Sequence, residues 1–265
     1  MRTVYVVIPA LNEAANIGRV FEDLRLARGR LPNGLDARVL LVDDGSADGT
    51  TEVARAAAGD IGLEVLRHDE PQGPGRAFAN AFARLEGVLA HEDFVLTIEA
   101  DNTSRLELLE RMLLRSREGY DSVFASPYAY GGGILNTNLM RTGLSHLANT
   151  FVKEFLGIHG LMTVSSFYRL YTGGAVRRLQ ERFGPGILER PGFECMVELT
   201  LKMIYMGMSI SEVAMVLDAK RRDGSSKMRV LRTGLGYLGL FRRKRAWRMA
   251  SGECEPRLAV RRKPP

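Results

Sequence analysis

Short apolar runs alternate with helix-like segments through the first 125 residues, and this alternation restricts the fold more than any other feature of the chain. The runs are rich in β-branched residues and nearly continuous in hydrophobicity, as is typical of strands buried on both faces of a parallel sheet. The segments between them have the periodicity of helices. The predicted strands cover residues 4–9, 39–42, 63–66, 94–98 and 122–125, and the predicted helices cover 13–27, 50–58, 75–89 and 104–117.

This βαβ alternation predicts an α/β fold of the Rossmann-like kind, with a mainly parallel sheet and helices on both faces. Ligands of such sheets bind beyond the carboxyl ends of the strands. The segments that begin at Pro9, Asp43, His68 and Glu99 should therefore meet around one site. Further along the chain, helical periodicity returns in residues 139–155 and 193–205.

Basic residues are concentrated at the end of the chain. Residues 219–265 hold 15 Lys and Arg against 3 Asp and Glu, so the first 218 residues are net negative although the whole chain carries +6. With 265 residues, we expect one domain over residues 1–228 and a basic appendage over 229–265, amphipathic at first and disordered at its end. Such an appendage suits nucleic acid, acidic lipid or a phosphorylated substrate, or it only promotes solubility.

The cysteines and the apolar stretches indicate in which cellular compartment the protein resides. Cys195 and Cys254 lack the spacing of a disulfide framework or a zinc cluster, which favours the cytoplasm. The apolar stretch at Val4–Leu11 contains Pro9 and is too short for a signal sequence or a membrane span. We expect a cytoplasmic protein, and peripheral attachment to the cytoplasmic face of a membrane stays open.

Acidic side chains follow three of the predicted strands. They are Glu13, the pair Asp43-Asp44, and the stretch Glu99-Ala100-Asp101. A single acidic residue at a strand end is often a helix cap, but carboxylates that converge repel one another unless they hold a cation or accept hydrogen bonds. Alternation along an extended segment places the Glu99 and Asp101 carboxylates on the same side. Hard oxygen ligands of this kind suit Mg²⁺ or Mn²⁺ completed by diphosphate oxygens.

At these residues the sequence resembles a known family. The runs VVIPALNEAANI and VLLVDDGSADGT, the Gly-Pro-Gly segment and IEAD occur in the order found in family 2 glycosyltransferases with the GT-A fold. Within that family the chain is most similar to the dolichol-phosphate mannose synthase and polyprenyl-phosphate glycosyltransferase group. The resemblance implies a GT-A catalytic domain and a nucleotide-sugar donor.

The resemblance also implies roles for individual residues. Glu99-Ala100-Asp101 occupies the position of the DxD motif, where metal and donor diphosphate meet, and Thr103 is a further metal ligand. Arg141, Arg221 and Lys227 match basic residues of the family, the last two within RRDGSSK, and are expected to act on phosphates beside Asp101. The expected nucleoside contacts are Pro9, Leu11, Glu13, Val42 and Asp44, and the expected acceptor region includes Ser166 and Arg169.

Three positions depart from the family pattern. Glu99 is one methylene longer than the first aspartate of DxD, Phe167 replaces a glycine, and Pro127 stands where an arginine is common. The last two departures put the identity of the acceptor in question. Arg169 has an alternative structural role on helix carbonyls, and Glu194 and Glu198 are expected on a solvated helical face.

The expected reaction is an inverting displacement of a nucleoside diphosphate at the anomeric carbon of a hexose, from a GDP- or UDP-sugar. A hydroxyl acceptor needs a general base, whereas a lipid phosphate is already anionic. The acceptor half is rich in basic residues, which favours a polyprenyl or dolichyl phosphate at a membrane surface. The alternatives are a hydroxyl acceptor on a glycan or natural product, or a non-catalytic nucleotide-sugar or nucleic-acid binding protein. The acidic site disfavours nucleic acid. The sequence leaves the oligomeric state undetermined.

Overall fold

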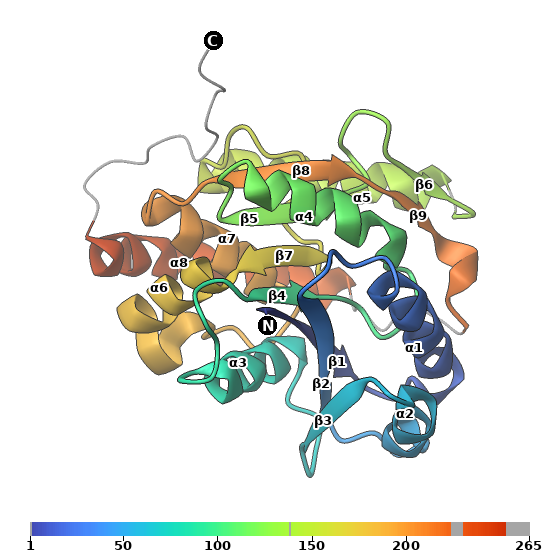
Figure 1. Cartoon of the computed structure of the whole chain (residues 1–265). Coiled ribbons are helices and arrows are strands. Elements are labelled where there is room, and N and C mark those ends of the chain that lie inside the picture. The colour runs from blue at the N-terminus through green and yellow to red at the C-terminus, as the bar shows by residue number, and fades with distance from the viewer. Residues whose placement is uncertain (1, 138, 224–229, 253–265) are drawn as a thin grey trace.

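We describe the protein from a computed structural model, which covers residues 2–137, 139–223 and 230–252 (Figure 1). The strands are β1 (Arg2–Ala10), β2 (Leu35–Asp43), β3 (Gly62–Arg67), β4 (Phe94–Thr97), β5 (Ser122–Ser126), β6 (Gly133–Leu135), β7 (Arg169–Thr172), β8 (Ile210–Ala214) and β9 (Val216–Asp218). The helices are α1 (Ala14–Arg28), α2 (Thr50–Ala58), α3 (Pro74–Leu85), α4 (Leu109–Arg117), α5 (Leu139–Leu156), α6 (Gly173–Phe183), α7 (Cys195–Tyr205) and α8 (Val230–Ser251). Three short 3₁₀ helices are η1 (Leu106–Leu108), η2 (Gly184–Ile187) and η3 (Ala219–Arg221).

The main sheet has seven strands in the order β3-β2-β1-β4-β7-β5-β8. All of its pairings are parallel except those of β7, which runs antiparallel to β4 and β5. The prediction of a mainly parallel α/β sheet is confirmed. β6 and β9 pair in a separate small sheet.

Side chains that alternate along the strands supply two hydrophobic layers, one on each face of the sheet. On β1, Val7 packs into the layer that includes α3, α6, α7 and α8, while Val6 and Ile8 pack into the layer that includes α1, α2 and α4. Figure 1 shows α3 on one side of β1–β3 and α1 with α2 on the other. This two-sided burial explains the nearly continuous apolar runs in the sequence.

The predicted helices and strands lie within a few residues of the observed ones. The predicted helix 75–89 is too long, because α3 ends at Leu85 and the chain turns at Gly87, whose φ of 76° suits glycine. The sequence did not reveal β7, α6 or β8. The strand β7 contains the buried Arg169 within only four residues, so it lacks a clear apolar pattern.

Within the predicted appendage, Val230–Ser251 form α8. Its Leu240 and Trp247 side chains are buried in the same core as α7, at 0% and 2% exposure. The inner face of α8 therefore belongs to the packing of the main domain. Among the described helices, none is both long and apolar enough to cross a bilayer.

Candidate active site

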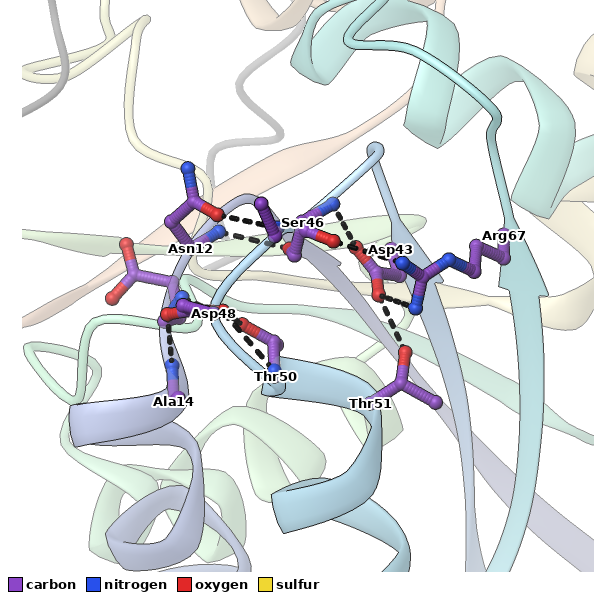
Figure 2. A network of polar contacts seen from close by, with 10 residues as sticks. Asn12, Ala14, Asp43, Ser46, Asp48, Thr50, Thr51 and Arg67 are labelled. Carbon is purple, nitrogen blue, oxygen red and sulfur yellow. Dashed lines mark hydrogen bonds and ion pairs between the residues drawn. The ribbon is translucent and has the colours of Figure 1, made fainter.

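The loops that follow β1 and β2 lie side by side and are joined by hydrogen bonds (Figure 2). The Asn12 backbone N–H donates to Ser46 Oγ at 2.9 Å, and the Ala47 N–H donates to Asn12 Oδ1 at 2.8 Å. Asn12 has a positive φ of 52°, a conformation that asparagine tolerates better than most residues. The two predicted ligand loops therefore form one surface at the carboxyl ends of neighbouring parallel strands.

Asp48 joins the first turns of α1 and α2. Its Oδ2 accepts from the Ala14 N–H at 2.9 Å, and its Oδ1 accepts from the Thr50 N–H at 3.1 Å (Figure 2). The Glu13 N–H donates to Thr50 Oγ1 at 2.8 Å. Donors that would otherwise lack partners at two helix N-termini are satisfied across the loops. The position of Glu13 is thus set by the β2–α2 loop.

Asp43 is fully buried below this surface. Its Oδ1 accepts from the Ser46 N–H at 2.8 Å, and its Oδ2 accepts from Thr51 Oγ1 at 2.5 Å and from Arg67 at 3.3 Å. Burial by itself raises the pKa of this carboxyl, but the hydrogen bonds and the charge of Arg67 lower the pKa below its ordinary value. Asp43 therefore stays ionised and holds the loop in place.

Asp44 is also buried, and it organises the segment between β3 and α3. Its Oδ1 lies 2.7 Å from His68 Nδ1 and accepts from the Gln72 N–H, while its Oδ2 accepts from the Gly73 N–H, both at 2.8 Å. A carboxylate has about four acceptor positions. These three contacts leave capacity on Oδ2 for one further donor.

The Gly73-Pro74-Gly75 segment passes very close to the backbone of Arg190 and Pro191. A Cβ on Gly75 would lie 1.8 Å from the Arg190 carbonyl oxygen, and one on Gly73 would lie 2.4 Å from that of Pro191. The Gly75 N–H donates to the Pro191 carbonyl at 2.8 Å. These glycines therefore let the N-terminus of α3 pack against the segment that leads into α7.

Glu13 is linked through Asn16 to Asp223, which follows η3. It is 9% exposed and accepts from Asn16 Nδ2 at 2.7 Å. Asn16 also donates to the Asp223 carbonyl at 3.0 Å and accepts from the Asp223 N–H at 2.8 Å. Residues far apart in the sequence thus meet beside α1. Pro9 and Val42 are paired in the register of β1 and β2, directly before these loops, and Leu11 immediately follows β1.

The stretch after β4 carries two neighbouring carboxylates. Glu99 is partly buried and accepts from Ser104 Oγ at 2.5 Å. Burial and the negative charge of Asp101 raise the pKa of Glu99. Asp101 Oδ1 accepts from the N–H and the Oγ1 of Thr103, at 3.1 and 2.6 Å. Ala100 between them is buried, so the backbone is anchored while the two carboxylates interact.

Arg222 forms an ion pair with Asp101 Oδ2. The neighbouring Arg221, which the sequence indicated as a phosphate contact, is paired with Asp23 and donates from Nε to the Asn102 carbonyl at 3.1 Å. The only sign of this arrangement in the sequence is that Arg221 and Arg222 are adjacent. The sequence did not show which arginine faces the acidic motif, because that depends on the path of the chain after η3.

Glu99 and Asp101 fit a divalent cation whose remaining ligands come from a donor diphosphate. Burial and, after it, the negative charge of Asp101 raise the pKa of Glu99, and a bound cation would oppose both effects. Among the residues that the structure describes, no group of three or more His, Cys, Asp or Glu side chains forms a metal site. A two-carboxylate site of this kind suits Mg²⁺ or Mn²⁺, which keep waters and take phosphate oxygens.

The predicted acceptor residues lie on the segment before and within β7. Arg169 is 0% exposed; Nε donates to the Ser166 carbonyl at 2.7 Å and Nη2 to the Val164 carbonyl at 2.7 Å. Its Nη1 donates to the Met196 carbonyl and to Thr200 Oγ1, both at 3.0 Å. These contacts support the alternative, structural role of Arg169. Ser166 is partly buried, and its Oγ accepts from the Tyr168 N–H at 3.2 Å.

Two expected basic groups lie outside the described part of the structure. Lys227 falls in residues 224–229, which are not described, and Arg141 falls within α5, where its side chain is not described. Phe167, one of the departures from the family pattern, is buried between Phe78 at 5.2 Å and Phe193 at 5.5 Å, measured between ring centroids. It therefore belongs to the core beneath the acceptor region.

The expectation that Glu194 and Glu198 lie on a solvated helical face is wrong. All residues of α7 are buried, because the helix packs between the sheet and α8. Glu198 accepts from Lys202 Nζ at 2.5 Å and from the Glu189 and Arg190 N–H groups at 2.9 Å. Burial raises the pKa of Glu198 and lowers that of Lys202, and their ion pair opposes both shifts. Glu194 is 7% exposed.

The protein has a GT-A fold, with a mainly parallel sheet and acidic loops at the ends of β1, β2 and β4. Its fold resembles the glucosyl-3-phosphoglycerate synthase of Mycobacterium tuberculosis, with a TM-score of 0.59 and 18% identity over 94% of this chain and 80% of that one. A second structure of that enzyme, in complex with Mn²⁺, uridine diphosphate and glucosyl-3-phosphoglycerate, has a TM-score of 0.57 at 20% identity and the same coverage. At such identities the likeness concerns the fold.

Residues 5–179 match the profile of Glycosyl transferase family 2, and the chain belongs to this family. The polyprenol monophosphomannose synthase of Mycolicibacterium smegmatis is 30% identical over 226 residues, which cover 84% of this chain and 80% of the relative. The undecaprenyl-phosphate mannosyltransferase of Micrococcus luteus is 30% identical over 227 residues, which cover 85% and 87%. The protein is therefore a glycosyltransferase, as the sequence motifs indicated.

Proposed function

We propose that this protein is an inverting glycosyltransferase that moves a hexose from a GDP- or UDP-sugar to a polyprenyl phosphate. The observation that carries the proposal is the convergence of Glu13, Asp44 and the pair Glu99 and Asp101 at one edge of the sheet, in a chain of family 2. One relative is named for the synthesis of polyprenol monophosphomannose and the other for mannosyl transfer with undecaprenyl phosphate, which supports a lipid phosphate as the acceptor.

In this proposal the donor lies over the ends of β1, β2 and β4. Pro9, Leu11, Glu13, Val42 and Asp44 contact the nucleoside, and the free acceptor position on Asp44 Oδ2 suits a donor group of the base or ribose. Glu99, Asp101 and Thr103 would hold Mg²⁺ or Mn²⁺, which would supply charge neutralisation for the diphosphate. Arg222 leaves Asp101 when the donor binds.

The transfer breaks the bond between the anomeric carbon and the donor diphosphate. An acceptor phosphate oxygen forms the new bond on the opposite face, and the nucleoside diphosphate departs. Arg141, Arg221 and Lys227 stabilise the negative charges on these phosphates. A phosphate acceptor is already anionic, so no general base has to remove a proton from it. Ser166 and Arg169 shape the acceptor side, with Arg169 acting as a positioning residue through the carbonyls that it binds.

The test compares two acceptors that differ in one group. Purified protein is incubated with radiolabelled GDP-mannose, UDP-glucose or dTDP-glucose, with and without Mn²⁺, and with either undecaprenyl phosphate or undecaprenol in detergent. We expect labelled lipid only with the phosphate, with one donor strongly preferred and with metal present. Transfer to the undecaprenol hydroxyl, or to neither lipid, would overturn the proposal.

We also propose that the protein is cytoplasmic and associates peripherally with the membrane, where such an acceptor resides.

A further inference from the structure

α5 carries apolar side chains on its outer side as well as its inner side. Val152 and Leu156 face the core and are 4% and 5% exposed. On the outer side, Leu147, Phe151 and Phe155 are 66%, 52% and 55% exposed. Their spacing of four residues places them in one stripe along the helix. A helix that is apolar on opposite sides needs cover on both, so this stripe marks an interaction surface.

The loop that follows α5 is held along the helix by two hydrogen bonds. Asn149 Nδ2 donates to the Met162 carbonyl at 2.6 Å, and Lys153 Nζ donates to the Leu161 carbonyl at 3.0 Å. These bonds leave the exposed stripe of α5 uncovered. We call Leu147, Phe151 and Phe155 together the α5 face.

A cluster of positive charge adjoins the α5 face. Phe155 packs edge-on against Phe241 of α8, with ring centroids 5.7 Å apart, and Lys244 Nζ donates to the Phe155 carbonyl at 3.3 Å. The basic run Arg242-Arg243-Lys244-Arg245 starts directly after Phe241, and α8 contains no acidic residue. Arg242 and Arg245 are exposed. An apolar surface bordered by lysine and arginine has the chemistry of a site for anionic lipid.

We propose that the α5 face and the basic run of α8 together dock the protein on an anionic membrane surface. Leu240 and Trp247 of α8 are buried in the core and cannot contact the membrane, whereas Met249 of the same helix is 73% exposed. Charge complementarity favours lipid over a second copy of the chain, since two copies would bring their basic runs together. The inference rests on the proposed function in one respect: a lipid acceptor lies in the membrane, so an enzyme that uses it has to reach the membrane surface.

The apolar part is tested with Leu147→Gln combined with Phe151→Gln. Leu26 on α1 and Leu114 on α4 are similarly exposed, at 64% and 52%, so Leu26→Gln combined with Leu114→Gln is the matched control. Sedimentation with vesicles of equal parts phosphatidylcholine and phosphatidylglycerol measures binding. We expect the α5 variant to bind at least about tenfold more weakly than wild type, and the control variant to bind like wild type.

The basic part is tested with Arg242→Gln combined with Arg245→Gln, with Arg111→Gln combined with Arg117→Gln on α4 as the control. We expect the α8 variant to lose roughly tenfold or more in affinity for the anionic vesicles, since each basic residue near such a surface contributes substantially. Wild type should bind pure phosphatidylcholine vesicles weakly. Point variants are preferable to deletion of α8, which would remove Leu240 and Trp247 from the core.

Equal binding of wild type and both variants to vesicles, or no binding by wild type, would overturn the docking proposal. So would a dimer in sedimentation velocity that the α5 substitutions abolish while vesicle binding persists, since the face would then be an interface between proteins. Transfer to undecaprenyl phosphate in detergent, measured on the same preparations, separates the two proposals. Intact transfer without vesicle binding defeats only the docking surface, and vesicle binding without transfer defeats only the proposed function.

Discussion

The proposed donor side and the proposed acceptor side of this protein satisfy their polar groups in different ways. On the donor side, the loops after β1 and β2 are held by local hydrogen bonds among neighbouring polar residues, centred on Asp43 and Asp48. On the acceptor side, single buried cations tie together segments far apart in the sequence: Arg169 binds the segment before β7 and α7, and Lys202 binds α7 and η2. Local bonding of the first kind can be read from a motif, whereas the second kind depends on tertiary packing.

The largest expected effect is a loss of stability on the proposed acceptor side, at the buried pair of Lys202 and Glu198. Lys202→Met leaves the Glu198 carboxylate buried without its cation, which should destabilise the protein by about 3–5 kcal/mol. Urea unfolding monitored by circular dichroism measures the change. Arg243→Met removes a partly exposed partner of Glu189 and is the control, with an expected loss below about 1 kcal/mol. Equal losses of unfolding free energy for both variants would show that the buried ion pair contributes no more to stability than the partly exposed one.

A comparably large effect on activity, without a loss of fold, is expected on the donor side. Asp101→Ala removes a carboxylate that we propose as a ligand of the cation, and should lower kcat by about 10²–10³-fold. The circular dichroism spectrum should stay unchanged. Asp60→Ala, which removes an exposed ion-pair partner of Arg28 at a distance from the motif, is the control for the assay. Full turnover by Asp101→Ala would remove this residue from the site.

A smaller effect concerns the pH dependence of stability. The pKa of Glu99 is raised in the folded protein, so its ionised form opposes folding, and this penalty is fully present above the raised pKa. Glu99→Gln should therefore melt at a higher temperature than wild type at neutral pH. Each kcal/mol corresponds to about 2–4 °C for a protein of this size.

The difference between Glu99→Gln and wild type should shrink as the pH falls through the raised pKa. It should vanish below about 4.3, the ordinary value for glutamate. Differential scanning calorimetry across this range measures it. A variant that melts below wild type at neutral pH would contradict the raised pKa of Glu99, which burial and the charge of Asp101 produce.

The smallest expected effect sharpens the role of Arg222. In the absence of donor, Arg222 competes with a cation for Asp101 Oδ2, so Arg222→Gln should tighten Mn²⁺ binding by a factor of about two to ten. Isothermal titration calorimetry on the protein without donor measures this affinity. Arg67→Gln removes a cation that pairs with Asp43 and should leave Mn²⁺ affinity unchanged. Weaker Mn²⁺ binding by Arg222→Gln would mean that the arginine supports the cation site.

Much of the fold and the donor side could be predicted because their signals are local. β1 to β5 contain nearly continuous apolar runs, and acidic residues follow β1, β2 and β4 within a few positions, so parallel pairing of β1 with β2 and β4 brings Glu13, Asp44 and Asp101 to one edge. The antiparallel β7 was missed because Arg169 interrupts its apolar pattern, and its place between β4 and β5 is a long-range pairing.

The sequence by itself determined the parallel α/β core, the family and the acidic edge, because periodicity and motif order are properties of short stretches of chain. Only the tertiary structure decided that Arg222 reaches Asp101, that Arg169 and Glu198 are buried, and that α8 turns Leu240 and Trp247 inward. It also left the outer side of α5 apolar and exposed. Those outcomes depend on which segments pack together, and burial, unlike periodicity, is set by neighbours that are distant in the sequence.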